Sequence, residues 1–403
     1  MRRLVFPFLL ALVGTGVQAA DGWQFDSRIA VTPEPARSTY HHLDGAGRRH
    51  IAVSGGMVAV TWEDDRSGDP QVYAAILSAD GKAFEGEVQL SNGDEAFEPG
   101  IAALAGGGFV VAWEQDGGVH LASLSADADI ATRRVLVSSG ASQPTLAAGH
   151  GRLEAAWRER IDGAWYLRHA RLDPSDSSLQ DIEIHAVEPN GTPKPVLFPS
   201  LALTPDGSTI GWEDRREGHT RILYAFSPVD NDAFTEPLSL NEFFANRNEY
   251  DKGSGAMRVA LAAMGEDEIV AAWMDKRRMG AGHGIFATFG AGAPLIFGPN
   301  EKVHGEVGDR QPHYNPSVAG DPDGNFVIAW DDFRSGTLDI WLSNYNDDLE
   351  WSDDYSPPPA SGDGEQSHPS VTLDDAGNLH MLWIERADPN APTQLWYARG
   401  TPR

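Results

Sequence analysis

The chain of 403 residues contains no cysteine. This excludes disulfides, a cysteine nucleophile, thiolate zinc sites and cysteine-ligated iron–sulfur clusters. Lysine is scarce as well, and 31 basic side chains face 59 acidic ones, which gives a formal net charge of −28. A chain this acidic is repelled by phosphate backbones and anionic lipid, so its charge argues against nucleic-acid binding. The 41% of hydrophobic residues allows a large core and disfavours disorder.

Helical periodicity is missing along the whole sequence, which points to an all-β fold. No apolar run reaches the roughly 20 residues that a membrane-spanning helix needs, so no membrane insertion is expected. Three catalytic motifs are also missing: the Gly-x-Ser-x-Gly elbow, the phosphate-binding P-loop and His-Glu-x-x-His. The sequence therefore identifies a fold more readily than a reaction.

The first twenty residues have the three parts of a secretory signal peptide. Met1–Arg3 is basic, Leu4–Val13 is apolar, and small residues lead up to Ala20. A buried N-terminal strand is the alternative interpretation. We expect residues 1–20 to be a signal peptide, with a mature chain that begins near Asp21 and is exported to a periplasm or to the cell exterior.

The remaining chain repeats one pattern, an apolar run that ends in tryptophan. The runs are Val58–Trp62, Phe109–Trp113, Leu153–Trp157, Ser208–Trp212, Ile269–Trp273, Phe326–Trp330 and Leu379–Trp383. Successive tryptophans lie 44 to 61 residues apart. Periods of this length are typical of propellers and other repeat architectures.

Each period contains four short apolar or alternating segments separated by Gly, Asp and Asn turns. Four antiparallel strands with such turns describe one propeller blade, and blades must stack into a ring to bury both faces. We predict a seven-bladed β-propeller over residues 21–403, as a single domain, with each tryptophan packed between neighbouring blades. The last repeat lacks a fourth strand, and residues 25–31 are predicted to supply it. A pair of β-sandwiches is the competing interpretation.

An acidic residue and an arginine follow the tryptophan at fixed offsets in four blades. The pairs are Asp64 and Arg66, Asp214 and Arg216, Asp275 and Arg277, and Asp332 and Arg334, while Gln115, Glu159 and Glu385 take the acidic position in other blades. They could form a ring of ligand-binding carboxylates, or each could be a turn staple in which the carboxylate pairs with the arginine and accepts turn amide protons. A catalytic group is needed once per site, whereas this motif recurs, so we interpret it as a staple.

An apolar strand ending in Trp-x-Asp-x-Arg-x-Gly, followed by an Asp-Ile-Tyr-like strand, resembles the repeats of the sialidase-like (BNR-repeat) propeller superfamily. The resemblance covers the mature chain and implies the propeller fold. Sialidases have six blades, and their turn and Arg-Ile-Pro motifs correspond here only to Ser78–Phe84 and Arg28–Ala30. No catalytic role is therefore assigned to Arg28. Seven-bladed relatives of this kind include polysaccharide lyases and lectins.

Candidate site residues come from loops that are unique to single blades, on the face where strand four leads to the next strand one and strand two to strand three. These loops surround the mouth of the central channel, where a pocket is expected. The catalytic candidates are His313, Tyr314, Arg310 and Tyr250, and the substrate-binding candidates are Arg247, His41, His42, His368 and Asn246. Arginine would neutralise a substrate carboxylate, and histidine or tyrosine would handle a proton. Solvated loops that cover the blade edges are the alternative interpretation.

No metal or cofactor site is predicted. Asp321–Asn325 is similar to a calcium loop, but phenylalanine follows where an EF-hand has glycine, so we interpret this segment as a strand one–two turn and do not predict calcium. The expected function is recognition of carbohydrate, an acidic polysaccharide or a glycan, with cleavage by hydrolysis or elimination left open. The alternative is a non-catalytic scaffold of the cell envelope or matrix that binds a protein ligand.

Overall fold

The computed structural model describes most of the chain after the N-terminal segment. The described ranges are 22–33, 39–45, 47–78, 81–127, 129–173, 182–188, 195–216, 220–242, 255–277, 282–305, 311–345 and 350–403. Among these residues, no helix combines the length and the apolar character needed to cross a membrane. The predicted signal peptide lies outside the described residues.

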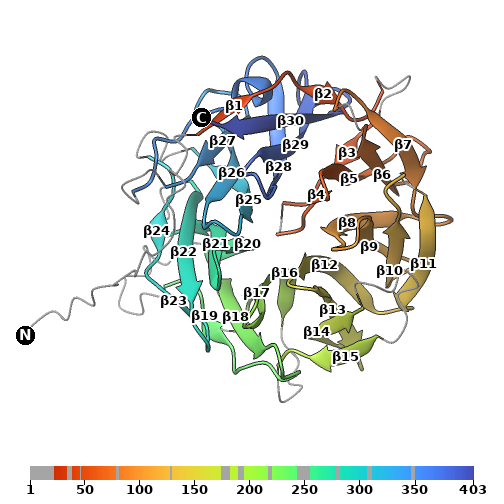
Figure 1. Cartoon of the computed structure of the whole chain (residues 1–403), viewed down its shortest axis with the longest axis vertical. Coiled ribbons are helices and arrows are strands. Elements are labelled where there is room, and N and C mark those ends of the chain that lie inside the picture. The colour runs from red at the N-terminus through yellow and green to blue at the C-terminus, as the bar shows by residue number, and fades with distance from the viewer. Residues whose placement is uncertain are drawn as a thin grey trace, which may run out of the picture.

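Seven antiparallel sheets stand in a ring, which confirms the predicted all-β, seven-bladed propeller (Figure 1). We number the blades from the one that contains Trp62. Blade 1 holds β3 (His41–His42), β4 (Ile51–Ser54), β5 (Met57–Asp64), β6 (Gln71–Leu77) and β7 (Phe84–Gln89), blade 2 holds β8 (Ala96–Ala103), β9 (Phe109–Gln115), β10 (Gly118–Leu124) and β11 (Ile130–Val137), and blade 3 holds β12 (Ala141–Gly149), β13 (Arg152–Ile161), β14 (Ala164–Leu172) and β15 (Glu183–Ala186).

The other four blades follow the same order, from the innermost strand outwards. Blade 4 holds β16 (Val196–Thr204), β17 (Gly207–Asp214), β18 (Arg221–Pro228) and β19 (Leu238–Ser239), blade 5 holds β20 (Gly255–Met264), β21 (Glu268–Lys276), β22 (Gly284–Ala291), β23 (Ile296–Phe297) and β24 (Glu301–Lys302), blade 6 holds β25 (His313–Gly320), β26 (Phe326–Asp332) and β27 (Asp339–Ser343), and blade 7 holds β28 (Glu365–Leu373), β29 (Leu379–Arg386) and β30 (Gln394–Pro402).

The N-terminal strands close the ring on blade 7, as predicted for residues 25–31, although the pairing begins at Trp23 and is divided into two short strands. β1 (Trp23–Phe25) pairs with Pro402–Gly400 of β30, and β2 (Ile29–Ala30) pairs with Tyr397–Trp396 of the same strand. Figure 1 shows β1, β2 and β30 side by side at one edge of the ring. The first and last segments of the propeller are therefore joined within one sheet.

Trp23 stabilises the pairing of the N-terminal strands with blade 7, and its replacement by alanine should destabilise the ring. Its side chain is 4% exposed, and its indole Nε1 donates a hydrogen bond to the Gly377 carbonyl oxygen at 3.0 Å. Loss of a buried tryptophan side chain lowers the free energy of unfolding by about 3–5 kcal/mol. Urea unfolding should show this loss for Trp23→Ala, whereas Gln24→Ala, at the neighbouring exposed position, should unfold like the wild type. Equal stability of the two variants would contradict this closure.

One hydrophobic cluster lies between each pair of neighbouring blades, and each cluster contains one of the seven repeated tryptophans. Trp113, for example, packs with Val72 and Ile76 of blade 1 and with Ile101 of its own blade. All seven indoles are essentially inaccessible to solvent. The predicted position of the tryptophans between blades is confirmed, and the ring is held by seven similar interfaces.

Four blades depart from the regular four strands, and in blades 5 and 7 the outermost strand is divided, into β23 and β24 and into β1 and β2. In blade 6 the sheet has three strands, and its outer edge is bonded by Tyr355, which exchanges two backbone hydrogen bonds with Leu342 at 2.9 and 3.1 Å. In blade 1 the innermost strand is split into β3 and β4, with eight residues between them. This split determines the shape of the central channel.

Candidate functional site at the channel mouth

The central channel is closed part-way along by residues 43–49, which we call the plug and of which Ala46 lies outside the described residues. In Figure 1 the chain between β3 and β4 reaches the centre of the ring. The space that remains beside the plug, near Asp44, Gly47 and Arg49, is about 10 Å³. That is too small to hold more than one water molecule, so the plug divides the channel into two separate compartments.

The plug and the residue that follows it contact every other blade. By blade, the Arg49 carbonyl accepts the Ile101 N–H of blade 2 at 2.8 Å, Arg48 Nε donates to the Pro144 carbonyl of blade 3 at 2.8 Å, Gly47 packs against Ser200 of blade 4 and Val259 of blade 5, Gly45 packs against Asn315 of blade 6, and the His50 N–H donates to Ser370 Oγ of blade 7 at 2.9 Å. The plug therefore connects the inner strands of the other six blades at the centre of the ring.

Above the plug, the side chains that directly follow the tryptophans point to the next blade. In blades 2 to 7 the inner strand starts with a bulge whose residue has a positive φ, such as Glu98 at 54° and His368 at 55°. The N–H of Glu98 donates to Glu63 Oε2 at 3.1 Å, and the N–H of His368 donates to Asp331 Oδ1 at 2.8 Å. Glu114 and Glu213 accept the same bond from Gln143 and Arg258. The carboxylates are thus fixed around the channel mouth.

An open cleft of about 440 Å³ lies at the mouth between blades 1 and 2. Three glutamates line it, Glu63, Glu98 and Glu114, and Tyr40 and Phe97 supply aromatic walls. A concave site with aromatic walls and a few convergent polar groups is the usual form of a small-molecule or sugar site. This cleft is therefore the candidate functional site.

Glu98 is held ionised within the cleft. Its Oε2 lies 2.7 Å from Arg48 Nη2 of the plug, and the Arg48 charge together with a hydrogen bond from Glu114 outweighs burial and lowers the pKa of Glu98. Burial first, and then the negative charge of Glu98, raise the pKa of Glu114 from 4.5 to about 7. Below about pH 7 Glu114 therefore holds a proton, which it donates towards the ionised Glu98 carboxylate.

Glu63, on the other side of Glu98, is also a weak acid. Burial raises its pKa from 4.5 to about 7, and the N–H of Glu98, which favours the ionised form, offsets only part of this effect. The cleft thus combines an ionised carboxylate with a neighbouring carboxyl that keeps its proton near neutral pH. Two carboxyls whose environments separate their pKa values in this way can act as a base and an acid.

Two histidines complete the mouth, and both were predicted from sequence. His42 and His368 approach with ring centroids 6.0 Å apart. Burial lowers the pKa of His368 to about 4, and burial together with Arg48 and Arg258 lowers the pKa of His42 despite the opposing charge of Glu98. Both rings are therefore neutral at pH 7 and offer hydrogen-bonding nitrogens without charge.

Two arginines bring positive charge to the same mouth. Arg258 lies over the Phe198 ring at 3.6 Å and bonds Asp44 Oδ1 at 3.3 Å, with 30% of its side chain exposed. Arg158 lies over the Trp165 ring at 3.6 Å, and Glu114 and Glu98 are the charges that act on it. Guanidinium groups held flat on aromatic rings are well placed to bind a carboxylate.

The other sequence candidates have different positions. His313 is fully buried, with Nε2 3.2 Å from Asp332 Oδ2 and its ring stacked on His304 at 3.9 Å. His41 is buried too, between Thr32 and Thr393. The His313 ring links blades 5 and 6 through His283 and His304, and it lies away from the cleft. The His41 ring links blades 1 and 7 through Thr393, and it also lines the cleft, as predicted for a site residue. Tyr314 is half-buried and packs at the interface between blades 5 and 6. Arg310, Tyr250, Arg247 and Asn246 lie outside the described residues.

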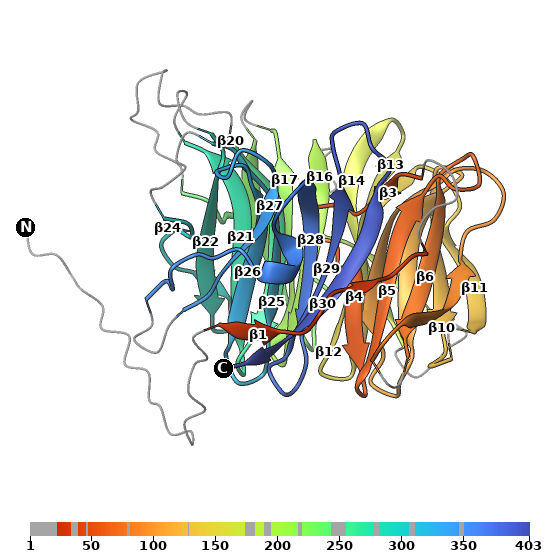
Figure 2. The same cartoon turned by 90° about the horizontal axis from the view of Figure 1, so that it is seen from above.

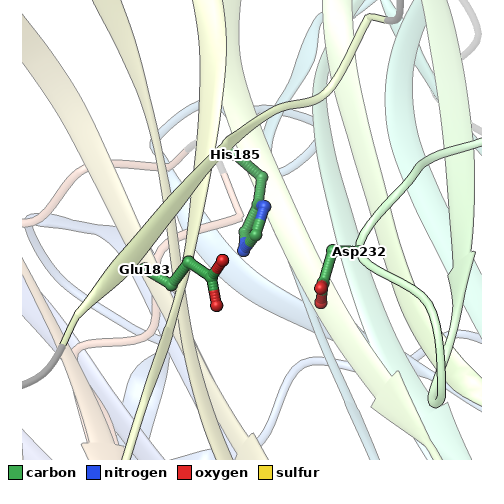
Figure 3. Close-up of side chains that lie close together, drawn as sticks. All are labelled: Glu183, His185 and Asp232. Atoms are coloured by element: carbon green, nitrogen blue, oxygen red, sulfur yellow. The ribbon is translucent and has the colours of Figure 1, made fainter.

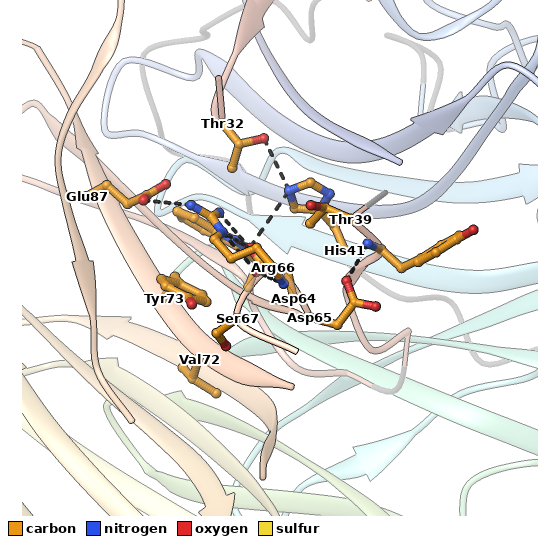
Figure 4. Close-up of polar contacts among 12 residues, drawn as sticks. Thr32, Thr39, His41, Asp64, Asp65, Arg66, Ser67, Val72, Tyr73 and Glu87 are labelled. Carbon is orange, nitrogen blue, oxygen red and sulfur yellow. Dashed lines mark hydrogen bonds and ion pairs between the residues drawn. The ribbon is translucent and has the colours of Figure 1, made fainter. Parts of the chain in front are cut away.

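The Asp–Arg motif is a structural staple, as Figure 4 shows for blade 1. Asp64 accepts hydrogen bonds from Trp62 Nε1 at 2.8 Å and from Arg66 Nη2 at 2.6 Å, and Arg66 also bonds Glu87 at 2.7 Å. Asp214, Asp275 and Asp332 repeat this arrangement. The carboxylates of this motif are engaged in hydrogen bonds to tryptophan and arginine side chains. The carboxylates that face the mouth are those that directly follow the tryptophans.

One described cluster has side chains suited to a metal ion. Glu183 and His185 of β15 and Asp232 of the next blade place their ligand atoms within 4.8 Å of one another (Figure 3). Asp232 already pairs with Arg171 at 2.6 Å, so a metal would have to replace that bond. The segment Asp321–Asn325 joins β25 to β26 as predicted, and Asp321 accepts the N–H groups of Asp323 and Asn325 at 3.0 and 2.9 Å.

The raised pKa values of the cleft glutamates predict a pH-dependent stability. The folded protein keeps the proton on Glu114 up to about pH 7, whereas the unfolded chain releases it near 4.5. The stabilisation that this proton provides is full below pH 4.5 and is lost as pH rises through 7. Relative to Glu114→Gln, the wild type should therefore lose unfolding free energy by up to about 1.4 kcal/mol per pH unit in this window.

Urea unfolding of both proteins at several pH values checks this prediction. Glu266→Gln is a matched control, because Glu266 is exposed in the turn between β20 and β21, on the opposite face of the ring. Its stability should follow that of the wild type at every pH. If the difference between wild type and Glu114→Gln did not change with pH, Glu114 would have an ordinary pKa.

The sequence contains one signal for the site residues that were not among the predicted candidates. Along a strand, successive side chains face opposite sides, so the residue after each tryptophan faces the next blade. Glu63, Glu114, Glu213 and Asp331 share that position. Arg48 and Glu98 had no such signal, because their proximity depends on the path of the plug.

Comparisons with known proteins give the fold. No known protein family matches the sequence, and no curated protein does. A protein of unknown function from Dyadobacter fermentans aligns over 95% of this chain and 100% of its own, with a TM-score of 0.58 and 9% identity. The phage phi92 endosialidase aligns over 94% of this chain and 70% of its own, with a TM-score of 0.53 and 10% identity. The shared feature is the fold, and kinship with BNR repeats stays a prediction.

Proposed function

We propose that the protein binds an acidic carbohydrate at the channel mouth and hydrolyses a glycosidic bond there. The observation that carries this proposal is the pairing of Glu63, whose pKa is raised to about 7, with Glu98, which Arg48 holds ionised in the same open cleft. One protonated and one ionised carboxyl beside a sugar-sized cleft form the usual apparatus for glycoside hydrolysis.

In the proposed reaction, Glu63 gives its proton to the glycosidic oxygen while the bond between that oxygen and the anomeric carbon breaks. A water molecule attacks the anomeric carbon, and the Glu98 carboxylate takes the proton that this water loses. The products are a new reducing end and a free hydroxyl group, and solvent returns the proton from Glu98 to Glu63. Glu114 acts through Glu98 by sharing a proton with it, so it is a positioning residue.

Acidic sugars fit the charges of the mouth better than neutral ones. Arg258 and Arg158 can bind a substrate carboxylate, and Tyr40 and Phe97 can stack on a sugar face. One fold neighbour is named an endosialidase, which makes polysialic acid a suitable probe. Among the described residues, the exposed large apolar side chains are spread over blades 1 to 6, from Tyr40 to Phe333, and form no single patch of the kind that a protein-binding scaffold would need.

A panel of polysialic acid, uronic-acid polymers and neutral arabinan tests the proposal, with binding, new reducing ends and unsaturated ends measured separately. We expect reducing ends without unsaturation from at least one acidic polymer, loss of this activity in Glu63→Gln, and full activity in Glu266→Gln. Unsaturated ends would show that the bond is cleaved by elimination and not by hydrolysis. If no member of the panel were bound or cleaved, the proposed function itself would be contradicted.

Export is part of the same proposal, and the pattern of residues 1–20 supports it. The full chain produced in a Gram-negative host should appear outside the cytoplasm. N-terminal sequencing of that material should begin near Asp21. Retention of Met1 on cytoplasmic protein would contradict export.

A further inference from the structure

Below the plug, the other compartment of the channel is a blind funnel of about 240 Å³. It opens on the face of the turns between the first and second strands, since Gly149, Gly265 and Pro322 lie at its rim. The plug closes its inner end, where Arg49 contributes to the lining. The funnel is therefore separate from the cleft at the mouth and faces the opposite side of the ring.

The walls of the funnel are mostly apolar and made of small side chains, and His150, Asp321 and Thr372 are the polar exceptions besides Arg49. Most of the lining comes from the inner strands, with residues such as Ile51, Ile101, Ala148 and Leu203. Apolar walls bind apolar surface and offer few hydrogen bonds to a hydrated polar molecule. The body of an occupant must therefore be aliphatic.

Arg49, at the inner end, is a cation without a counter-ion among the described residues. Its Nη2 donates to the Leu261 carbonyl oxygen at 3.2 Å, and burial is the one cause that acts on its pKa, which it lowers. An arginine stays protonated in proteins, so its positive charge persists at this depth. Its neighbour Arg48 shows the contrast, because it pairs with Asp44 and Glu98.

A buried charge is normally paired, and an unpaired one is strongly unfavourable. In a chain with a net charge of −28, which has carboxylates to spare, none of the described ones pairs with Arg49. Arg49 is half-buried as a residue, and it lines both the funnel and the small space beside the plug. One of its donors bonds Leu261, which leaves the others for a ligand that enters the funnel.

We propose that the funnel binds a small aliphatic monocarboxylate, with the carboxylate on Arg49 and the hydrocarbon chain along the walls. A guanidinium group and a carboxylate form two parallel hydrogen bonds, which suits a planar anion better than a hydrated phosphate. The volume equals that of about eight water molecules at about 30 Å³ each, so a short-chain acid fits and a long-chain one does not. This site lies beyond the function proposed for the mouth.

Isothermal titration of the mature protein with hexanoate, 1-hexanol and inorganic phosphate tests the proposal. We expect hexanoate to bind with one site per chain and at least tenfold more tightly than 1-hexanol, which has the same chain without the charge. Phosphate should not bind. Binding of phosphate without hexanoate, or equal binding of hexanoate and hexanol, would overturn the assignment.

Two variants place the ligand in the funnel. Arg49→Met removes the charge and should weaken hexanoate binding at least tenfold while changing hexanol binding little. Ala148→Leu keeps Arg49 and fills the funnel, so it should abolish binding of both molecules even if Arg49→Met folds poorly. Arg160→Met, at an exposed arginine, is the control and should bind like the wild type. Unchanged hexanoate binding in Ala148→Leu would overturn the site.

Discussion

Replacement of Gly47 by alanine should lower the free energy of unfolding by roughly 2–5 kcal/mol, from backbone strain and overpacking together. Gly47 has a φ of +69°, which disfavours a side chain. A Cβ atom there would lie 2.5 Å from Ser200 Oγ and 2.5 Å from the Val259 carbonyl oxygen. Because these atoms belong to blades 4 and 5, the plug cannot shift away without losing contact with the other blades.

Gly56→Ala separates packing from backbone strain. Gly56 also has a positive φ, +82°, but a Cβ atom there would meet nothing within 4 Å. Its replacement should lower the unfolding free energy by only about 1–2 kcal/mol, the usual effect of a left-handed backbone. Urea unfolding measures both. Equal losses for the two variants would show that the plug is loosely packed and does not clamp the ring.

Replacement of Glu63 or Glu98 by glutamine should lower kcat/KM for glycoside hydrolysis by roughly 10²–10⁴-fold. Glutamine keeps the size of each side chain but can neither give up nor accept the proton that the reaction moves. The wild-type pH profile should fall on the alkaline side near pH 7, where Glu63 loses its proton. Hydrolysis rates measured across this range on the substrate found in the panel test this prediction.

Glu114→Gln distinguishes a positioning residue from a catalytic one. The amide of glutamine can still donate a hydrogen bond to Glu98, so the variant should stay within about tenfold of wild-type activity. Its pH profile should shift, because the proton shared with Glu98 is gone. A loss as large as that of Glu63→Gln, with an unshifted profile, would instead make Glu114 the acid. Unchanged activity in Glu63→Gln would contradict the assignment of Glu63.

The blade pattern could be predicted from sequence because it is local. The seven tryptophans and their turns recur at similar spacing, and the spare segment near Phe25 matches a missing strand in the last repeat. Each of these features depends on residues that are close together in the chain or repeated around the ring. The same logic correctly identified the Asp–Arg pairs as staples.

The site could not be predicted in the same way, because it depends on contacts between distant residues. Arg48 reaches Pro144, which is 96 positions away, only because residues 43–49 enter the channel instead of forming a surface loop. His313 was chosen as a residue unique to its loop, yet its register opposite Asp332 places its ring in the interior, against His283 and His304 of blade 5. The sequence gives no sign of which side of the strand such a histidine occupies.

The most direct test of the proposed site is the titration of the glutamate carboxyls by carbon-13 NMR. We predict two carboxyl resonances with midpoints near pH 7, one missing from Glu63→Gln and the other from Glu114→Gln. Glu98 should titrate below its ordinary range. If instead every glutamate titrated near 4.5, the cleft would hold no acid at neutral pH, and the proposed hydrolysis would have no proton donor.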